Sequence, residues 1–358
     1  MTNTIETTIA AIQPLDQKSM AAARQRQDNL TKPRGSLGRL EELSIQIAGI
    51  TGNTLPKLEH KAIITMAADH GVVDEGVTLY PQEVTRQMVY NFLSNGAAIN
   101  VLARHIDARV IVVDMGVIGG FEPLPGLICK MIDFGTKNMA QGPAMTRQQA
   151  IDTIDAGIEI VLAEKKKGLD IIATGDMGLG NTTASSAILT TISGYSPDVT
   201  TGRGTGIDDE QMAHKIKIIE KSLATNNPNL KDPLDILAKV GGFEIGGLAG
   251  VILAGAAYKI PVVIDGFVSG AAALIATSLC PQVNDYLIAS HVSAEAGHPL
   301  LLEFLNLKPL LNLNMRLGEG TGAALGISLA GASVKLLTEM TTFGEAGVSD
   351  IETPEERG

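Results

Sequence analysis

The chain has 358 residues, of which 45% are hydrophobic, and it carries a formal net charge of −11. This length and composition suit one large domain or two modest ones with a sizeable core. They argue against nucleic acid as a partner, because a sequence-independent binder needs a concentrated basic surface and the longest basic run is residues 165–167.

Two cysteines, Cys129 and Cys280, lack the spacing of a metal site or a disulfide framework, so we expect a reduced, cytoplasmic compartment. The N-terminus shows no basic segment followed by an apolar one, and we expect no signal peptide. No apolar run free of glycine and charge reaches the roughly 18–20 residues that a membrane helix needs. We therefore predict no membrane association.

The first predicted elements are two helices, over 15–30 and 39–50. From residue 61 onward, short β-rich apolar runs alternate with helical segments. The runs carry an acid or a glycine near their ends and read “AIITMAADHG”, “RVIVVDMGV”, “LDIIATGDMG” and “PVVIDGFVSG”, with “NDYLIASHVS” as a looser copy. Further helices are predicted over 82–104, 146–166, 182–193, 209–224, 244–258 and 267–278, and “LLNLNM” (310–315) is β-like.

The strands show no polar alternation, which indicates a mostly parallel sheet with helices on both faces, the α/β class. Ligands of open α/β sheets bind outside the carboxyl ends of the strands. Asp69, Asp114, Asp176 and Asp265 all lie near that expected edge. Each of them either faces a ligand there or only caps a helix and fixes a turn, and the pattern does not separate these two roles.

Two glycine-rich stretches are candidate phosphate sites. The first is “TGDMGLGNTTASSAI” (174–188), which follows a strand and opens a helix but lacks the spacing of a dinucleotide fingerprint or a P-loop. The second is the loop at 202–206 with Arg203, followed by a helix with Lys215. A structural turn and a mobile surface loop, respectively, are the alternative interpretations.

Glu319 lies in a third glycine-rich stretch, “RLGEGTGAAL” (316–325). A partly desolvated carboxylate at the ligand edge is a candidate general base, whereas an acid near a helix N-terminus also stabilises the helix dipole. Glu244, in “GGFEIGGLAG”, is open to the same two interpretations. The six histidines show no metal-ligand spacing, so we predict no metal, and the serines form no GxSxG nucleophile motif.

Several motifs occur together and in order: “KPRGSLGRLEEL”, “ADHGVVDEGVTLYPQEVTRQM”, “TGDMGLGNTTASSAI”, “TGRGTG”, “KVGGFEIGGLAG”, “DGFVSGAAAL” and “RLGEGTGAAL”. This set, from about residue 10 to 340, resembles the nicotinate-nucleotide–dimethylbenzimidazole phosphoribosyltransferase family. The resemblance implies an enzyme that converts nicotinate mononucleotide and 5,6-dimethylbenzimidazole into α-ribazole 5′-phosphate and nicotinate, with inversion at C1′, in cobalamin biosynthesis.

The resemblance also implies a Rossmann-like sheet, a homodimer, and no metal or other cofactor. It implies a large catalytic domain over 60–335 and a small helical domain built from 1–59 and 336–358. The alternatives are a non-catalytic protein that binds nicotinate mononucleotide and a Rossmann-type dehydrogenase, although the latter needs a GxGxxG after its first strand that this chain lacks.

By resemblance, Glu319 is the general base that removes the benzimidazole N–H proton, and Asp176 stands where many relatives have a glutamate. The shorter side chain of Asp176 weakens any transfer of that glutamate's role to this chain. The implied phosphate and ribose contacts are Gly178, Gly202, Arg203, Gly204 and Lys215. The implied walls of the base pocket are Tyr80, Met88, Met315 and Leu317.

Overall fold

The structure is a computed structural model that describes residues 4–204 and 206–349. These residues pack as two compact units. The large unit comprises residues 4–13 and 59–327, and the small unit comprises residues 14–58 and 328–349. Residues 4–13 therefore belong to the large unit, whereas the resemblance placed residues 1–59 in the small domain. The reason is that Ile5 is buried there and the Tyr286 hydroxyl donates to the carbonyl oxygen of Gln13.

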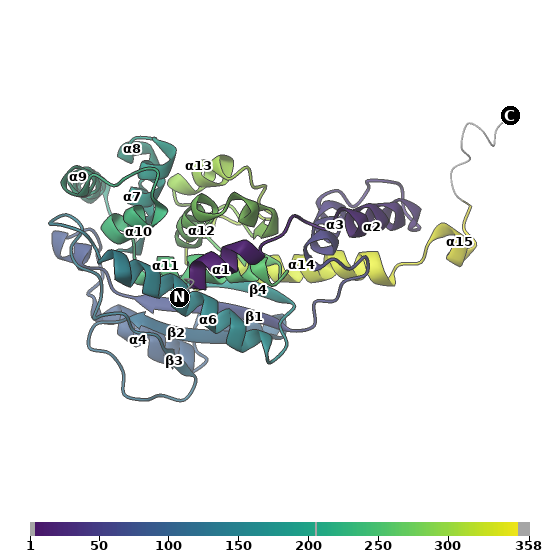
Figure 1. The fold of residues 1–358 in the computed structure, drawn as a ribbon, viewed down its shortest axis with the longest axis horizontal. Helices are drawn as coiled ribbons and strands as arrows, with labels where there is room; N and C mark the ends of the chain where they lie inside the picture. The colour runs from purple at the N-terminus through teal and green to yellow at the C-terminus, as the bar shows by residue number, and fades with distance from the viewer. Residues whose placement is uncertain (1–3, 205, 350–358) are drawn as a thin grey trace. The chain divides into compact units, whose positions relative to one another are not determined.

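The large unit is built on a parallel sheet of six strands in the order β3-β2-β1-β4-β5-β6. Figure 1 labels the first four strands of this order. This is the strand order of a Rossmann doubly wound sheet, whose switch point lies between β1 and β4. The predicted fold class is thus confirmed. The strands are β1 (Lys61–Ala68), β2 (Ala108–Gly116), β3 (Leu127–Cys129), β4 (Ile171–Met177), β5 (Val262–Ile264) and β6 (Leu287–Ala289).

Strands β1 and β4 run in register from Lys61 beside Ile171 to Ala67 beside Met177. Both are buried along nearly their whole length, as central strands covered on two faces are. Their shared register brings the segments that follow both strands to one edge of the sheet. That edge is the one at which a ligand site is expected.

The helices of the large unit include one close pair, α6 and α11. A Cβ atom built on Gly157 of α6 would lie 1.9 Å from the carbonyl oxygen of Gly247 in α11, so glycine is required for this approach. The helices are α1 (Thr4–Ala11), α4 (Glu83–Leu93), α5 (Ala98–His105), α6 (Arg147–Lys165), α7 (Asn181–Ser193), α8 (Pro197–Thr200), α9 (Asp209–Asn226), α10 (Pro233–Val240), α11 (Phe243–Ala257), α12 (Phe267–Leu279) and α13 (Gly297–Phe304), with 3-10 turns η1 (Gly71–Glu75) and η2 (Pro281–Tyr286).

The small unit contains α2 (Gln17–Asn29), α3 (Arg39–Thr51) and α15 (Phe343–Ala346). Helix α14 (Thr321–Glu339) begins in the large unit and ends in the small one. By length and composition α14 could cross a membrane, but 56% of it is buried in the fold, as is common for a core helix. Ala23, Ile45, Ala48 and Leu337 form the apolar core of the small unit.

Three local predictions differ from the structure. The predicted helix 82–104 is two helices, because Asn95 adopts φ +60° and Gly96 follows it, a pair that favours a turn. The stretch 310–315 is not a strand, and only Leu311 bridges, to His291. Short elements were not predicted, namely strand β3 and helices α1, α8, α10, α13 and α15.

Candidate active site

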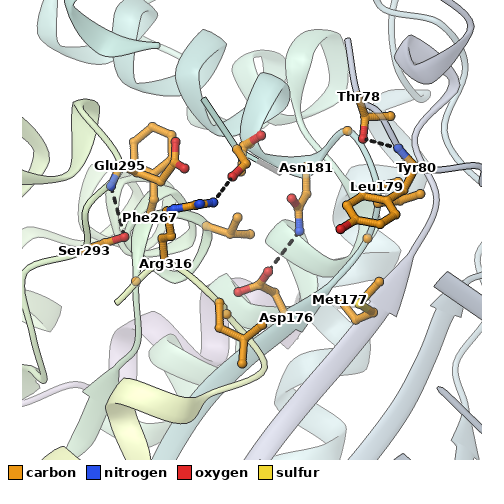
Figure 2. A pocket seen from close by; sticks show the side chains of 18 of the residues that line it. Thr78, Tyr80, Asp176, Met177, Leu179, Asn181, Phe267, Ser293, Glu295 and Arg316 are labelled. Atoms are coloured by element: carbon orange, nitrogen blue, oxygen red, sulfur yellow. Dashed lines mark hydrogen bonds between the residues drawn. The ribbon is translucent and has the colours of Figure 1, made fainter. Parts of the chain in front are cut away.

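A cavity of about 300 Å³ opens at the carboxyl edge of the sheet (Figure 2). It is lined by segments that follow four different strands: 77–80 after β1, 176–182 after β4, 266–268 after β5 and 291–295 after β6. Gly204 and residues 316–318 complete the lining. The parallel topology therefore gathers into one site residues that lie far apart in the sequence.

One end of the cavity presents groups that bind anions. Helix α7 begins there without a side-chain cap, so the positive end of its dipole faces the cavity. The N–H groups of Asn181 and Thr183 donate to the carbonyl oxygens of Gly178 and Gly180, at 3.4 and 3.0 Å. The Lys215 ammonium lies beside this turn and donates to Thr182 Oγ1 at 2.9 Å and to the carbonyl oxygen of Gly202 at 3.2 Å. Arg316 lines the same end and donates to the carbonyl oxygen of Gly204 at 2.9 Å.

Glu295 stands among these cations. Its side chain packs so closely that a Cβ atom on Gly202 would lie 1.8 Å from Glu295 Oε2. Burial lowers the pKa of Lys215 to about 8, and the negative charge of Glu295 opposes this shift. Burial raises the pKa of Glu295, while Lys215 and the Gly204 N–H lower it. The negative charge of Glu295 thus favours the charged form of Lys215, whose ammonium lies next to the candidate phosphate position.

Apolar side chains also line the cavity. Val77, Leu179 and Met177 line it, and Tyr80 and Leu317 stand at its mouth with 52% and 59% of their surfaces exposed. Large apolar side chains left half-exposed beside a cavity suit a flat apolar ligand, which would cover them.

The Asp176 side chain lines the cavity at the end of β4 and accepts a hydrogen bond from the Asn181 amide at 2.9 Å (Figure 2). Burial raises the pKa of Asp176 well above its usual range, and the nearby carboxylates Asp265, Glu244 and Glu319 raise it further. Burial thus disfavours the charged form of Asp176 more than the Asn181 hydrogen bond favours it.

Glu319 is held in a left-handed backbone conformation, with φ +64°. Its N–H donates to the carbonyl oxygen of Asp176, and its carbonyl oxygen accepts from Thr65 Oγ1. Its carboxylate is buried and accepts from the N–H of Ile99 at 3.1 Å, at the start of helix α5. Burial raises the pKa of Glu319, and the Ile99 N–H lowers it.

The comparisons with known proteins agree with this geometry. A family model described as phosphoribosyltransferase matches residues 12–348. The chain is 60% identical over 342 residues to the nicotinate-nucleotide–dimethylbenzimidazole phosphoribosyltransferase of Desulforudis audaxviator, covering 96% of this chain and 97% of the relative. The chain belongs to the nicotinate-nucleotide–dimethylbenzimidazole phosphoribosyltransferase family.

Other members of the family support the same assignment. The protein of that name from a Roseiflexus species is also 60% identical, over 96% of this chain and 97% of its own. The crystal structure of a family member from Thermus thermophilus superposes with a TM-score of 0.89 at 44% identity, covering 94% of this chain and 100% of that one. The chain is thus a phosphoribosyltransferase enzyme of this fold.

The structure brings most of the predicted site residues together. Those that line the cavity are Tyr80, Asp176, Gly178, Gly204 and Leu317, and Lys215 and Gly202 lie directly behind this lining. Glu319 is adjacent to the lining residue Gly318 but is itself buried, with 4% of its surface exposed.

Three further predicted residues lie outside the lining and away from it. The Arg203 guanidinium pairs with Asp209 and donates to the carbonyl oxygen of Ile207, so it turns away from the phosphate end. Met88 is half-buried on helix α4, where the Asn91 amide contacts its sulfur. Met315 is half-buried and pairs through its backbone with Ala294.

Sequence reasoning missed Arg316 and Glu295 as members of the site. Arg316 stands three residues before Glu319, so its place in the same glycine-rich turn was an available signal. Nothing in the local sequence marks Glu295. His291 also lines the cavity, whereas His70 is buried and forms a hydrogen bond with Glu244 at 2.7 Å.

Proposed function

We propose that this phosphoribosyltransferase transfers the 5-phosphoribosyl group of nicotinate mononucleotide to 5,6-dimethylbenzimidazole, releasing nicotinate. The observation that carries the proposal is the joining, in one cavity, of anion-binding groups and apolar side chains, with the Asp176 carboxyl group also in the lining. A nucleotide with one phosphate and a flat apolar acceptor ring would bind these groups side by side.

The phosphate of the nucleotide would lie at the start of helix α7, against the Gly204 backbone and the Lys215 ammonium. The positive end of a helix dipole and a buried cation both favour a phosphate. Arg316 would close this end from the outer side. Holding the phosphate there fixes the ribose over Asp176, which contributes to the rate through proximity and orientation.

Glu319 would act as the general base. As one benzimidazole nitrogen bonds to C1′, the ring gains positive charge unless the N–H proton on its other nitrogen is removed. The Ile99 N–H occupies Oε2 of Glu319, which leaves Oε1 to take that proton. The bound ring would reach Glu319 beside Gly318, which lines the cavity. Asp176, whose burial favours the protonated form, would instead donate a hydrogen bond to the nucleotide.

The electron pair of the broken C1′–N bond leaves with the nicotinate ring, which departs as a neutral pyridine. Because attack comes from the face opposite the leaving group, the β-nucleotide yields the α-product. The leaving group needs no acid, so the single proton transferred in this step goes to Glu319.

The test is to incubate the purified chain with both substrates and to separate the products by chromatography. We expect α-ribazole 5′-phosphate and nicotinate in equal amounts. Binding of nicotinate mononucleotide with no release of nicotinate would instead identify a non-catalytic nucleotide-binding protein.

A further inference from the structure

The turn that carries Glu319 is held by a second buried acid, Asp265. This residue directly follows strand β5 and has 1% of its surface exposed. Asp265 Oδ2 accepts from the N–H of Gly320 at 3.1 Å, and Oδ1 accepts from the N–H of Ala323 at 2.9 Å. Both carboxylate oxygens are thus used on the residues that follow Glu319.

The same turn packs against β4 with no spare room. A Cβ atom on Gly175 would lie 2.3 Å from the carbonyl oxygen of Glu319, and one on Gly320 would lie 2.7 Å from Ile63. The positive φ of Glu319 is costly for a residue with a side chain, and it persists only where the surroundings fix it. Asp265 supplies two of the hydrogen bonds that do so.

Asp265 does not line the cavity, so it does not touch the substrates directly. We propose that Asp265 is a positioning residue for Glu319: by binding the N–H groups of Gly320 and Ala323, it fixes the turn and thereby aims the Glu319 carboxylate. This inference rests on the proposed role of Glu319 as the general base.

The Asp265→Asn variant tests the proposal, because it keeps the size of the side chain but places an NH₂ group against one of the two N–H donors. Misplacement of a catalytic group by about 1 Å can cost on the order of 10²-fold in rate. We therefore expect kcat to fall by about 10²-fold, with the KM for nicotinate mononucleotide within about threefold of wild type.

Asp114→Asn is the matched control. Asp114 is also 1% exposed at a strand end and also accepts two backbone N–H bonds, from Gly116 at 3.0 Å and Val117 at 2.9 Å. It does not line the cavity either, and we expect its kcat to stay near that of wild type. Equal losses of kcat in the two variants would mean that any buried aspartate that accepts two backbone N–H bonds matters as much as Asp265. That result would overturn the inference.

A double variant separates positioning from general support of the fold. If Asp265 acts through Glu319, Asp265→Asn combined with Glu319→Gln should be no slower than Glu319→Gln alone. The inference would be overturned if the double variant lost kcat by the product of the two single losses. It would also be overturned if Asp265→Asn kept the wild-type kcat while Glu319→Gln lost activity. Full turnover by Glu319→Gln would instead overturn the general-base role itself.

A second variant covers the case in which Asp265→Asn does not fold. Thr65 is fully buried, and its hydroxyl donates to the carbonyl oxygen of Glu319 at 3.0 Å. Thr65→Val removes this other restraint on the turn. We expect a lower kcat that is again not additive with Glu319→Gln, and a kcat equal to that of wild type would contradict the positioning account.

Discussion

Replacing Lys215 with Met tests the phosphate end of the cavity. The substitution removes one buried charge with little change in length, and it also leaves the buried Glu295 without that cation. The part of the loss that depends on the substrate is the charged hydrogen bond to the phosphate. Such a bond contributes about 1.5–3 kcal/mol. At about 1.36 kcal/mol per tenfold change, kcat/KM for nicotinate mononucleotide should fall by about 10- to 150-fold.

The assay compares nicotinate mononucleotide with nicotinate riboside, which lacks the phosphate. The loss in Lys215→Met should appear with the nucleotide and nearly vanish with the riboside. Thermal unfolding should show that the variant is folded. An equal loss on both substrates would refute the assignment of Lys215 to the phosphate, since it would indicate damage to the whole site.

The pH dependence gives an independent readout of the same group. Burial lowers the pKa of Lys215 to about 8. The ammonium that attracts the phosphate is therefore present below pH 8 and is lost as the pH rises through that value. In wild type, kcat/KM for the nucleotide should fall above about pH 8, and this limb should be missing in Lys215→Met.

Three further predictions concern the walls of the cavity. Arg316→Ala should raise the KM for nicotinate mononucleotide more than Arg203→Ala does, because only Arg316 lines the cavity, and the reverse order in steady-state kinetics would count against the placement of these side chains. Gly175→Ala should lower the free energy of unfolding by about 1–3 kcal/mol in urea titrations, because its Cβ would collide with the Glu319 carbonyl oxygen, and unchanged stability would contradict that packing. Tyr80→Ala should raise the KM for dimethylbenzimidazole and spare that for the nucleotide, and the opposite split would show that Tyr80 does not border the acceptor.

The sheet could be predicted because its strands are buried on both faces. A run such as “AIITMAADHG” is apolar throughout and ends in an acid and a glycine, a pattern that identifies both the strand and the ligand edge. Strand β3 was missed because it is only three residues long. The split between α4 and α5 depends on the positive φ of Asn95, which “SNG” signals only weakly.

The site was predicted less completely, because side-chain direction depends on contacts distant in sequence. Arg203 lies in the expected loop, but its guanidinium forms a salt bridge with Asp209 and does not line the cavity. Glu319 was expected either to be a base or to stabilise its own helix. In the structure its carboxylate instead accepts a hydrogen bond from the N–H of Ile99, at the start of a different helix, α5. Ile99 lies 220 positions away in the sequence. The homodimer and the cytoplasmic location stay predictions.

The most direct test of the account is the turnover of Glu319→Gln, measured as α-ribazole 5′-phosphate formed from both substrates. Glu164→Gln is the matched control, since Glu164 is also a buried glutamate but pairs with Arg109 and Lys167 away from the cavity lining. The account predicts a loss of about 10²- to 10⁴-fold in kcat for Glu319→Gln, with nucleotide binding retained and the control near wild type. Turnover near the wild-type rate in Glu319→Gln would contradict it.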